Sequence, residues 1–88
     1  MDDTTKRDWK KKLVEEYEDE IEGAEKYLDL AKEAEEAECY ITANAIELIA
    51  HEEFSHANFL HGRLEEWGML PREKEEAWEK LERKFGYR

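Results

Sequence analysis

Residues 13–34 of this 88-residue chain read LVEEYEDEIEGAEKYLDLAKEA, and this stretch decides the fold. It contains a stripe of mostly apolar residues separated by alternating steps of four and three positions. That spacing places the whole stripe on one side of an α-helix and is typical of helices packed in bundles. We therefore predict a helix over residues 8–37, with Glu20 as the one charged member of its stripe. The stripe comprises Leu13, Tyr17, Glu20, Ala24, Tyr27, Ala31 and Ala34.

A second stripe with helical spacing predicts another helix over residues 40–67. Gly68 stands where a helix commonly ends, because glycine accepts the left-handed conformation required there. Heptad steps continued from the first stripe miss the second by one residue, which favours a tight turn within residues 35–40 over one continuous helix. The two helices are thus expected to form an antiparallel hairpin. The second stripe comprises Ile46, Ile49, Glu53, His56, Leu60, Leu64 and Trp67.

A short third helix is predicted over residues 71–85, because Pro71 suits the first position of a helix. One of its faces carries Ala77, Trp78, Leu81 and Phe85. Phe54 and Phe59 lie outside the hairpin stripes and are expected to contact this third helix or further subunits. No alternating β-branched run is present, so the expected fold is all-α, with residues 1–88 as a single domain.

The balance of charge excludes several classes of function. The chain has 14 Lys and Arg residues against 25 Asp and Glu residues, a net charge of −11. That charge repels phosphate backbones, so we expect no nucleic-acid partner. No apolar run reaches the length of a membrane span, and no apolar signal segment follows Met1. Cys39 alone permits neither an internal disulfide nor a two-cysteine metal site. We expect a cytoplasmic protein without a membrane partner.

Three ionisable side chains lie within the two stripes, namely Glu20 in the first and Glu53 and His56 in the second. Because burying a charge without a partner is costly, such groups are usually paired or bound to a metal. Glu53 and His56 are three residues apart, so they can converge on one point, and in a hairpin Glu20 faces them. Two carboxylates and one imidazole suit iron or manganese. The sequence therefore predicts a metal site at these three residues.

The histidines also allow other interpretations. His51 and His56 stand close to the spacing of a zinc-protease motif, but at five residues apart they point about 140° away from each other. We expect His51 and His61 to be exposed. Glu20, Glu53 and His56 can alternatively form a buried polar cluster that sets the register of a non-catalytic helical oligomerisation module. The same ligand set also accepts manganese or zinc in place of iron.

Two motifs resemble those of rubrerythrin-type ferritin-like proteins over about residues 13–67. They are E-x-x-G-A-x-x-Y-x-x-x-A-K at residues 20–32 and E-x-x-x-H-E-E-F-S-H-A at residues 47–57. The resemblance implies a di-iron ferroxidase that oxidises Fe(II) to Fe(III) with O₂ or peroxide, in iron storage or detoxification. It implies that Glu20 is a terminal carboxylate ligand, Glu53 a bridging carboxylate and His56 an imidazole ligand. It further implies that Tyr27 donates a hydrogen bond to a ligand carboxylate.

The chain departs from that family in carrying half of the ligand set. Ferritin-like bundles have four helices, two with a Glu ligand and two with a Glu-x-x-His motif. A homodimer of this chain would supply Glu20, Glu53 and His56 twice, bind two irons and complete a four-helix bundle. The form is similar to the half-ferritins housed in encapsulin shells, although residues 84–88 show no obvious shell-targeting peptide. One cysteine cannot build the rubredoxin centre of true rubrerythrins.

Overall fold

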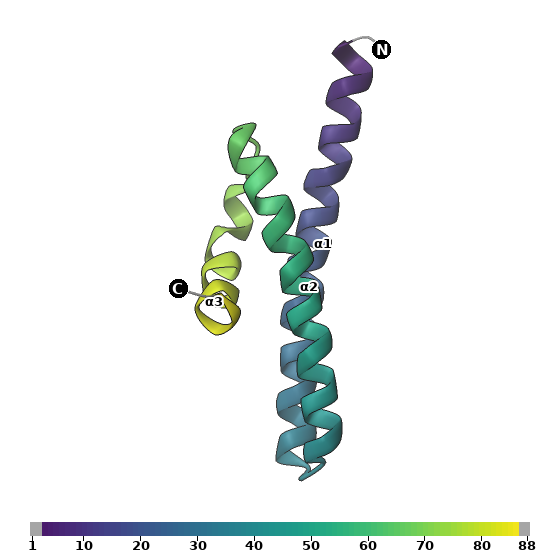
Figure 1. Cartoon of the computed structure of the whole chain (residues 1–88), viewed down its shortest axis with the longest axis vertical. Helices are drawn as coiled ribbons and strands as arrows, with labels where there is room; N and C mark the ends of the chain where they lie inside the picture. Colours follow the sequence, from purple (N-terminus) through teal and green to yellow (C-terminus); the bar gives the residue numbers. More distant parts are fainter. Residues whose placement is uncertain (1–2, 87–88) are drawn as a thin grey trace.

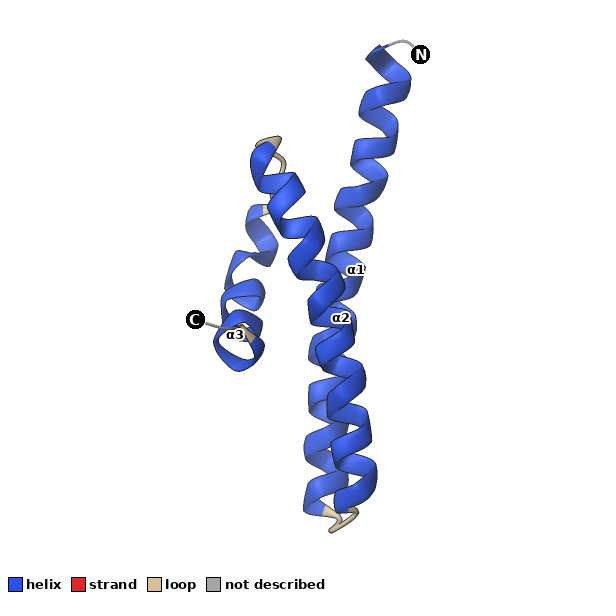
Figure 2. Ribbon diagram, viewed as in Figure 1, coloured by secondary structure: helices blue, strands red, loops and turns tan. Residues whose placement is uncertain are grey.

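The computed structural model describes residues 3–86, with side chains from residue 8 onward, and this range contains helices and no strand. Helix α1 spans Asp3–Glu36 and helix α2 spans Tyr40–Glu66. A 3₁₀ turn, η1, at Arg72–Lys74 leads into α3, Glu75–Phe85. The first two helices run antiparallel as a hairpin, and α3 lies beside it (Figures 1 and 2). The predicted all-α fold is confirmed. No helix within residues 3–86 has the length and apolar character needed to cross a membrane.

Both helices of the hairpin end in the same type of turn. After α1, Glu38 takes a left-handed φ of 63°, and the Cys39 N–H donates to the Ala34 carbonyl at 2.8 Å. After α2, Gly68 takes a φ of 69°, and the Met69 N–H donates to the Leu64 carbonyl at 2.8 Å. Such bonds satisfy carbonyls that the end of a helix leaves unpaired. The first turn lies within the predicted interval 35–40, and Gly68 has the predicted role.

The core lies where α3 covers the middle of the hairpin. On α1 the buried residues follow the predicted stripe, with Ile21 added beside it. On α3 the buried residues are Trp78 and Leu81, both from its predicted apolar face. Burial of large side chains from three helices holds these helices together, since each fully buried large side chain contributes about 1.5–3 kcal/mol. The core cluster comprises Tyr17, Ile21, Ala24, Phe54, Ala57, Leu64, Trp78 and Leu81.

The stripe predicted for α2 is not the one that the chain buries. The buried stripe is turned by roughly 80° around the helix from the predicted one. Its alanines allow α1 to approach closely, and Phe54 stacks on Trp78 with ring centroids 5.0 Å apart. In contrast, Ile49 and His56 of the predicted stripe are exposed. The buried residues of α2 are Ala43, Ala50, Phe54, Ala57 and Leu64.

Helix α3 also covers the two histidines that were expected to be exposed. His51 stacks on Phe85 with centroids 5.0 Å apart, and His61 stacks on Trp78 at 4.0 Å. Both imidazoles are therefore half-buried, and the expectation of exposure is wrong. The spacing of residues within α2 gave no sign that aromatic side chains from a later helix would reach these positions.

Two ion pairs fix α3 and its leading turn on the hairpin. Lys74 Nζ lies 2.7 Å from Glu22 Oε1, and Lys84 Nζ lies 3.2 Å from Glu47 Oε1. The α-helix starts at Glu75 rather than at residue 71, because Pro71 has an extended ψ of 123° and residues 72–74 form the 3₁₀ turn. The ion pairs thus join α1 and α2, respectively, to the two ends of this C-terminal unit.

The chain exposes more surface than a compact monomer of its size. Its extents are 54 × 24 × 19 Å and its Cα radius of gyration is 15.1 Å, against about 12 Å for a compact chain of this length. Its accessible surface is 6583 Å², against about 5,500 Å² expected from its mass. The excess follows from a hairpin that α3 covers on one side only (Figure 1).

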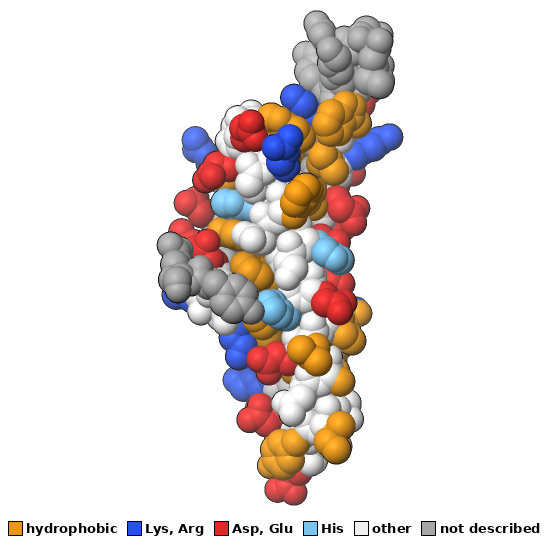
Figure 3. All heavy atoms as spheres, in the orientation of Figure 1, with side chains coloured by type: hydrophobic (Ala, Val, Ile, Leu, Met, Phe, Trp, Pro, Cys, Tyr) orange, Lys and Arg blue, Asp and Glu red, His pale blue; other side chains and the backbone are white. Residues whose placement is uncertain are grey.

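The uncovered side of the hairpin, which we call the open face, carries large apolar side chains from α2. Ile41 and Phe59 are 88% and 71% exposed, and Leu48 and Ile49 lie between them along the helix. Helical spacing places all four within about 80° of His56 around α2, and Leu48 also lines a pocket with Lys84 and Phe85 of α3. Hydrophobic side chains recur along the length of the hairpin in Figure 3. An exposed apolar surface of this kind is typical of an interaction site.

Candidate metal centre

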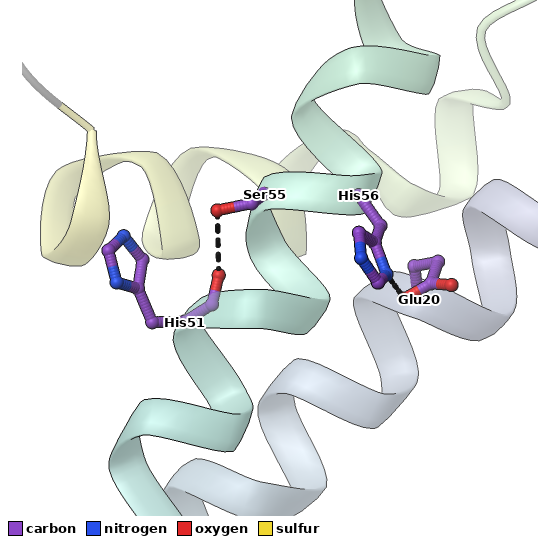
Figure 4. A network of polar contacts seen from close by, with 4 residues as sticks. All are labelled: Glu20, His51, Ser55 and His56. Atoms are coloured by element: carbon purple, nitrogen blue, oxygen red, sulfur yellow. Dashed lines mark hydrogen bonds and ion pairs between the residues drawn. The ribbon is translucent and has the colours of Figure 1, made fainter.

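The hairpin brings together the three side chains that the sequence singles out. Glu20 lies midway along α1, and Glu53 and His56 lie one turn apart midway along α2. Ligand atoms of the three side chains all lie within 4.8 Å of one another. Figure 4 shows Glu20 and His56 pointing toward each other, whereas His51 points toward α3. Among the described residues, no other group of three or more His, Cys, Asp or Glu side chains is arranged closely enough to hold a metal ion.

The Glu20 carboxylate is poorly solvated and lacks a hydrogen-bond donor. Its side chain is 15% exposed, and its Oε2 atom is buried without a hydrogen bond within the described residues. Burial and, to a smaller extent, the neighbouring Glu53 carboxylate raise the pKa of Glu20 to about 7, although His56 opposes both effects. A buried carboxylate oxygen of this kind is stabilised by a proton or by a cation.

His56 contacts this carboxylate from the open face. Its Nδ1 atom lies 3.4 Å from Glu20 Oε2, beyond the usual range of a hydrogen bond, and its side chain is 65% exposed. The imidazole therefore lies at the rim of the cluster, with Glu20 beneath it. The sequence predicted that His56 belongs to a buried stripe. Within residues 3–86, however, no helix covers the side of α2 on which His56 lies.

A glycine on α1 makes room for the third ligand. A Cβ atom on Gly23 would lie 3.2 Å from Glu53 Oε2. Glycine inside a helix costs about 1 kcal/mol relative to alanine, so the chain accepts a cost at the position that the Glu53 carboxylate approaches. In the sequence, Gly23 is only one position of a motif. Its contact with Glu53 depends on the distance between the helices, which the sequence does not give.

The donor set fits a divalent transition metal. Bonds of about 2.1 Å allow two ligand atoms on one ion to be at most about 4.2 Å apart, so the 4.8 Å cluster needs only a small contraction. Two carboxylates would neutralise the charge of one M²⁺ ion, and the imidazole suits Fe, Mn or Zn. The orphaned Glu20 Oε2 would gain the partner that it lacks.

Tyr27 lies two turns along α1 from Glu20 and is half-buried. Within residues 3–86 the structure has no hydrogen bond between Tyr27 and a ligand carboxylate. Its expected contact with a ligand stays a prediction.

Comparison of the chain with protein-family models, with curated proteins and with solved structures found no match. The resemblance to rubrerythrin-type proteins thus rests on the two short motifs in the hairpin. Function has to be inferred from the chemistry of Glu20, Glu53 and His56 and from the surface around them.

Proposed function

We propose that two copies of this chain associate through their open faces and form a ferritin-like four-helix bundle that oxidises iron. Glu20, Glu53 and His56 of both copies would bind two Fe²⁺ ions between them, and O₂ or peroxide would oxidise these to Fe³⁺ for storage or detoxification. The observation that carries this proposal is the position of the cluster. Glu20 lies beneath His56, which is exposed on the side of α2 that also carries exposed apolar side chains.

Charge supports a shared site. Each copy contributes the carboxylates of Glu20 and Glu53, so a dimer holds four negative charges against the four positive charges of two Fe²⁺ ions. Without metal, the same four carboxylates would repel one another at close range. We therefore expect Fe²⁺ to promote dimerisation, since binding at the interface adds its free energy to association.

The open face supplies the apolar surface that a dimer needs. Ile41, Leu48 and Phe59 lie on both sides of His56 along α2, so a second hairpin placed across this face would cover them and the imidazole together. Their burial contributes about 25 cal/mol for each Å² removed from water. The dimer axis would then pass near the metal centre, as a closed two-fold arrangement requires.

The reaction balances with iron as the substrate. Two Fe²⁺ ions give one electron each to O₂, which takes up two protons and leaves as hydrogen peroxide. The carboxylates neutralise the added charge of the two Fe³⁺ ions, and His56 supplies a neutral donor. With peroxide as oxidant, the same two electrons and two protons yield two water molecules.

An anaerobic Fe²⁺ titration monitored by analytical ultracentrifugation, followed by admission of air, tests the proposal. We expect one Fe²⁺ bound per chain, a shift from monomer to dimer, and rapid formation of ferric absorption. Glu53→Ala should abolish all three, whereas Glu52→Ala, a change at the exposed neighbouring residue, should leave them intact. Binding well below one ion per chain, or equal losses in both variants, would refute a site built on Glu53.

The contact between His56 and Glu20 across the two helices supports a second candidate, an oligomerisation module that uses the cluster only to set register. In that case Glu53→Leu combined with His56→Leu raises the melting temperature, and no metal changes the stability of the unmodified chain. A melting temperature that rises with Fe²⁺, Mn²⁺ or Zn²⁺ would count against this candidate. An encapsulin shell as a further partner stays a prediction from the resemblance.

A further inference from the structure

A cavity lies where α3 and the loop before it meet the hairpin. It has a volume of about 460 Å³, within the about 300–1,000 Å³ typical of small-molecule sites. Tyr17 of α1 and His61 and Glu65 of α2 contribute to its walls, and α3, η1 and the loop before η1 provide the rest. The lining residues are Tyr17, His61, Glu65, Leu70, Pro71, Arg72, Glu75, Trp78, Glu79 and Glu82.

Two polar groups in this cavity make no hydrogen bond to another described residue. Tyr17 is 2% exposed, yet no hydrogen bond within residues 3–86 involves its hydroxyl. The His61 imidazole lies 5.9 Å from the Tyr17 ring between centroids, and likewise makes no hydrogen bond among the described residues. Burial raises the pKa of Tyr17 well above its usual value and lowers the pKa of His61. A neutral phenol and a neutral imidazole both offer a lone pair to a donor.

The rim of the cavity is strongly acidic. Four carboxylates line it, against Arg72 as the one cationic side chain among the lining residues. The charges of Glu65 and Glu82 act on the His61 imidazole, which places these two carboxylates beside the two polar groups. A cavity lined mainly by one sign of charge concentrates ions of the opposite sign. This charge balance excludes an anion as the ligand.

A bare metal ion is also a poor occupant. The described residues hold a single set of three or more closely arranged metal ligands, and that set is Glu20, Glu53 and His56. The cavity moreover has apolar walls from Leu70, Pro71 and Trp78 that a hydrated ion would not use. A ligand with a cationic, hydrogen-bond-donating end and a short aliphatic body uses both parts of the lining.

We propose that this cavity binds a small aliphatic amine, with a diamine as the best match. One ammonium group donates hydrogen bonds to the Tyr17 hydroxyl and to the His61 imidazole. The methylene chain lies along Leu70 and Pro71, and a second ammonium group reaches the carboxylates of the rim. This site uses none of the residues of the metal centre, so a test of amine binding is independent of a test of iron oxidation.

Isothermal titration calorimetry with putrescine as the probe tests the proposal, with butanediol as its uncharged counterpart. We expect saturable binding of putrescine with one site per chain, and no binding of the diol. Tyr17→Phe should raise the Kd about fivefold, the loss of one hydrogen bond, while keeping the aromatic core. Glu79→Gln should raise the Kd about threefold, the loss of one partly exposed ion pair.

Glu33→Gln is the matched control, because Glu33 is an exposed acid on α1 that does not line the cavity. Its Kd should equal that of the unmodified chain. If Glu33→Gln weakens binding as much as Glu79→Gln, putrescine acts as a non-specific counterion and the site is refuted. Equal affinity in Tyr17→Phe, or equal binding of the diol, overturns the proposed role of the Tyr17 hydroxyl and of the charge.

Discussion

Gly23 on α1 faces the Glu53 carboxylate so closely that an added Cβ atom would lie 3.2 Å from Glu53 Oε2. That separation is tighter than an ordinary van der Waals contact, so the carboxylate would have to move. The contact links an unfavourable residue inside a helix to the position of a metal ligand. A substitution at Gly23 can therefore raise the stability of the hairpin and lower the metal affinity of the site at the same time.

Gly23→Ala should therefore have opposite effects on the two properties. Alanine favours the helix by about 1 kcal/mol, so the metal-free chain should be as stable as before or more stable in urea denaturation. The displaced Glu53 carboxylate should weaken Fe²⁺ binding by about tenfold, comparable to the loss of one well-placed supporting contact at a metal site. Calorimetric titration with Fe²⁺ under anaerobic conditions measures the affinity.

Gly62→Ala provides the control for this substitution. Gly62 also lies within a helix, but a Cβ atom there would meet nothing within 4 Å. The same gain in helix stability of about 1 kcal/mol is expected, with unchanged metal affinity. A loss of Fe²⁺ affinity in both variants would show that helix rigidity, not the Glu53 contact, controls the site.

Replacing Glu20 should stabilise the metal-free chain while removing metal binding. Near neutral pH the Glu20 carboxylate is partly ionised, although its Oε2 atom is buried without a hydrogen-bond donor among the described residues. Glu20→Gln keeps the shape and removes the charge, so the free energy of unfolding in the presence of a chelator should rise by about 1 kcal/mol. Stabilisation by Fe²⁺ should disappear. A less stable metal-free variant would contradict the view that Glu20 is held at a cost.

The sequence was a good guide to elements and ligands but not to the buried face of α2. Periodicity located the hairpin and its turn, and the stripe positions of Glu20, Glu53 and His56 predicted a cluster that the structure brings together. Two stripes of α2 have helical spacing, however, and large side chains such as Ile49 favoured the wrong one. Alanines at 50 and 57 are buried because helices approach closely there, and spacing alone does not reveal this.

The proposed dimer concerns exposed residues that mostly lie outside the predicted stripe of α2. Of that stripe, Ile49 and His56 are exposed, whereas the exposed Ile41, Leu48 and Phe59 belong to neither stripe. What would cover these side chains is a relation between distant surfaces, which the spacing of residues within α2 does not give. The contacts of His51 and His61 with α3 were missed for a related reason, because they join residues distant in sequence.

Phe59→Lys tests whether the open face is a dimer interface. Phe59 is 71% exposed, so the isolated chain should change in stability by less than about 0.5 kcal/mol. A dimer would bury this position together with its two-fold copy, and two lysines would then be desolvated. Analytical ultracentrifugation with Fe²⁺ should show a monomer. Tyr40→Lys, an exposed aromatic residue at the hairpin turn on another side of α2, should still dimerise.

The turn of the hairpin offers a stabilising substitution. Glu38 holds a φ of 63°, a conformation that costs an L-residue about 1–2 kcal/mol. Glu38→Gly should raise the free energy of unfolding by about 0.5–1 kcal/mol, since part of the gain is offset by the greater freedom of glycine in the unfolded chain. Glu33→Gly, within the last turns of α1, should lower it by about 1 kcal/mol. Urea denaturation of both variants checks the pair.

The half-buried imidazole of His61 should make the stability of the chain depend on pH. Burial lowers the pKa of His61 in the folded state, although the carboxylates of Glu65 on α2 and Glu82 on α3 pull it upward, and Arg72 and the neutral Tyr17 also line the same cavity. Below the ordinary histidine pKa of 6.5 the unfolded chain then binds more protons than the folded one, so this contribution to stability falls as pH decreases.

His61→Phe should abolish that contribution while preserving an aromatic ring against Trp78. We expect the difference in unfolding free energy between the variant and the unmodified chain to grow in favour of the variant between pH 6.5 and pH 5. Comparing the two chains at each pH removes the contributions of Glu20 and of the other carboxylates that do not act on His61, because both chains share them. A difference that stays constant over this range would mean that the His61 pKa is the same in the folded and unfolded states, and that the cavity does not desolvate the imidazole.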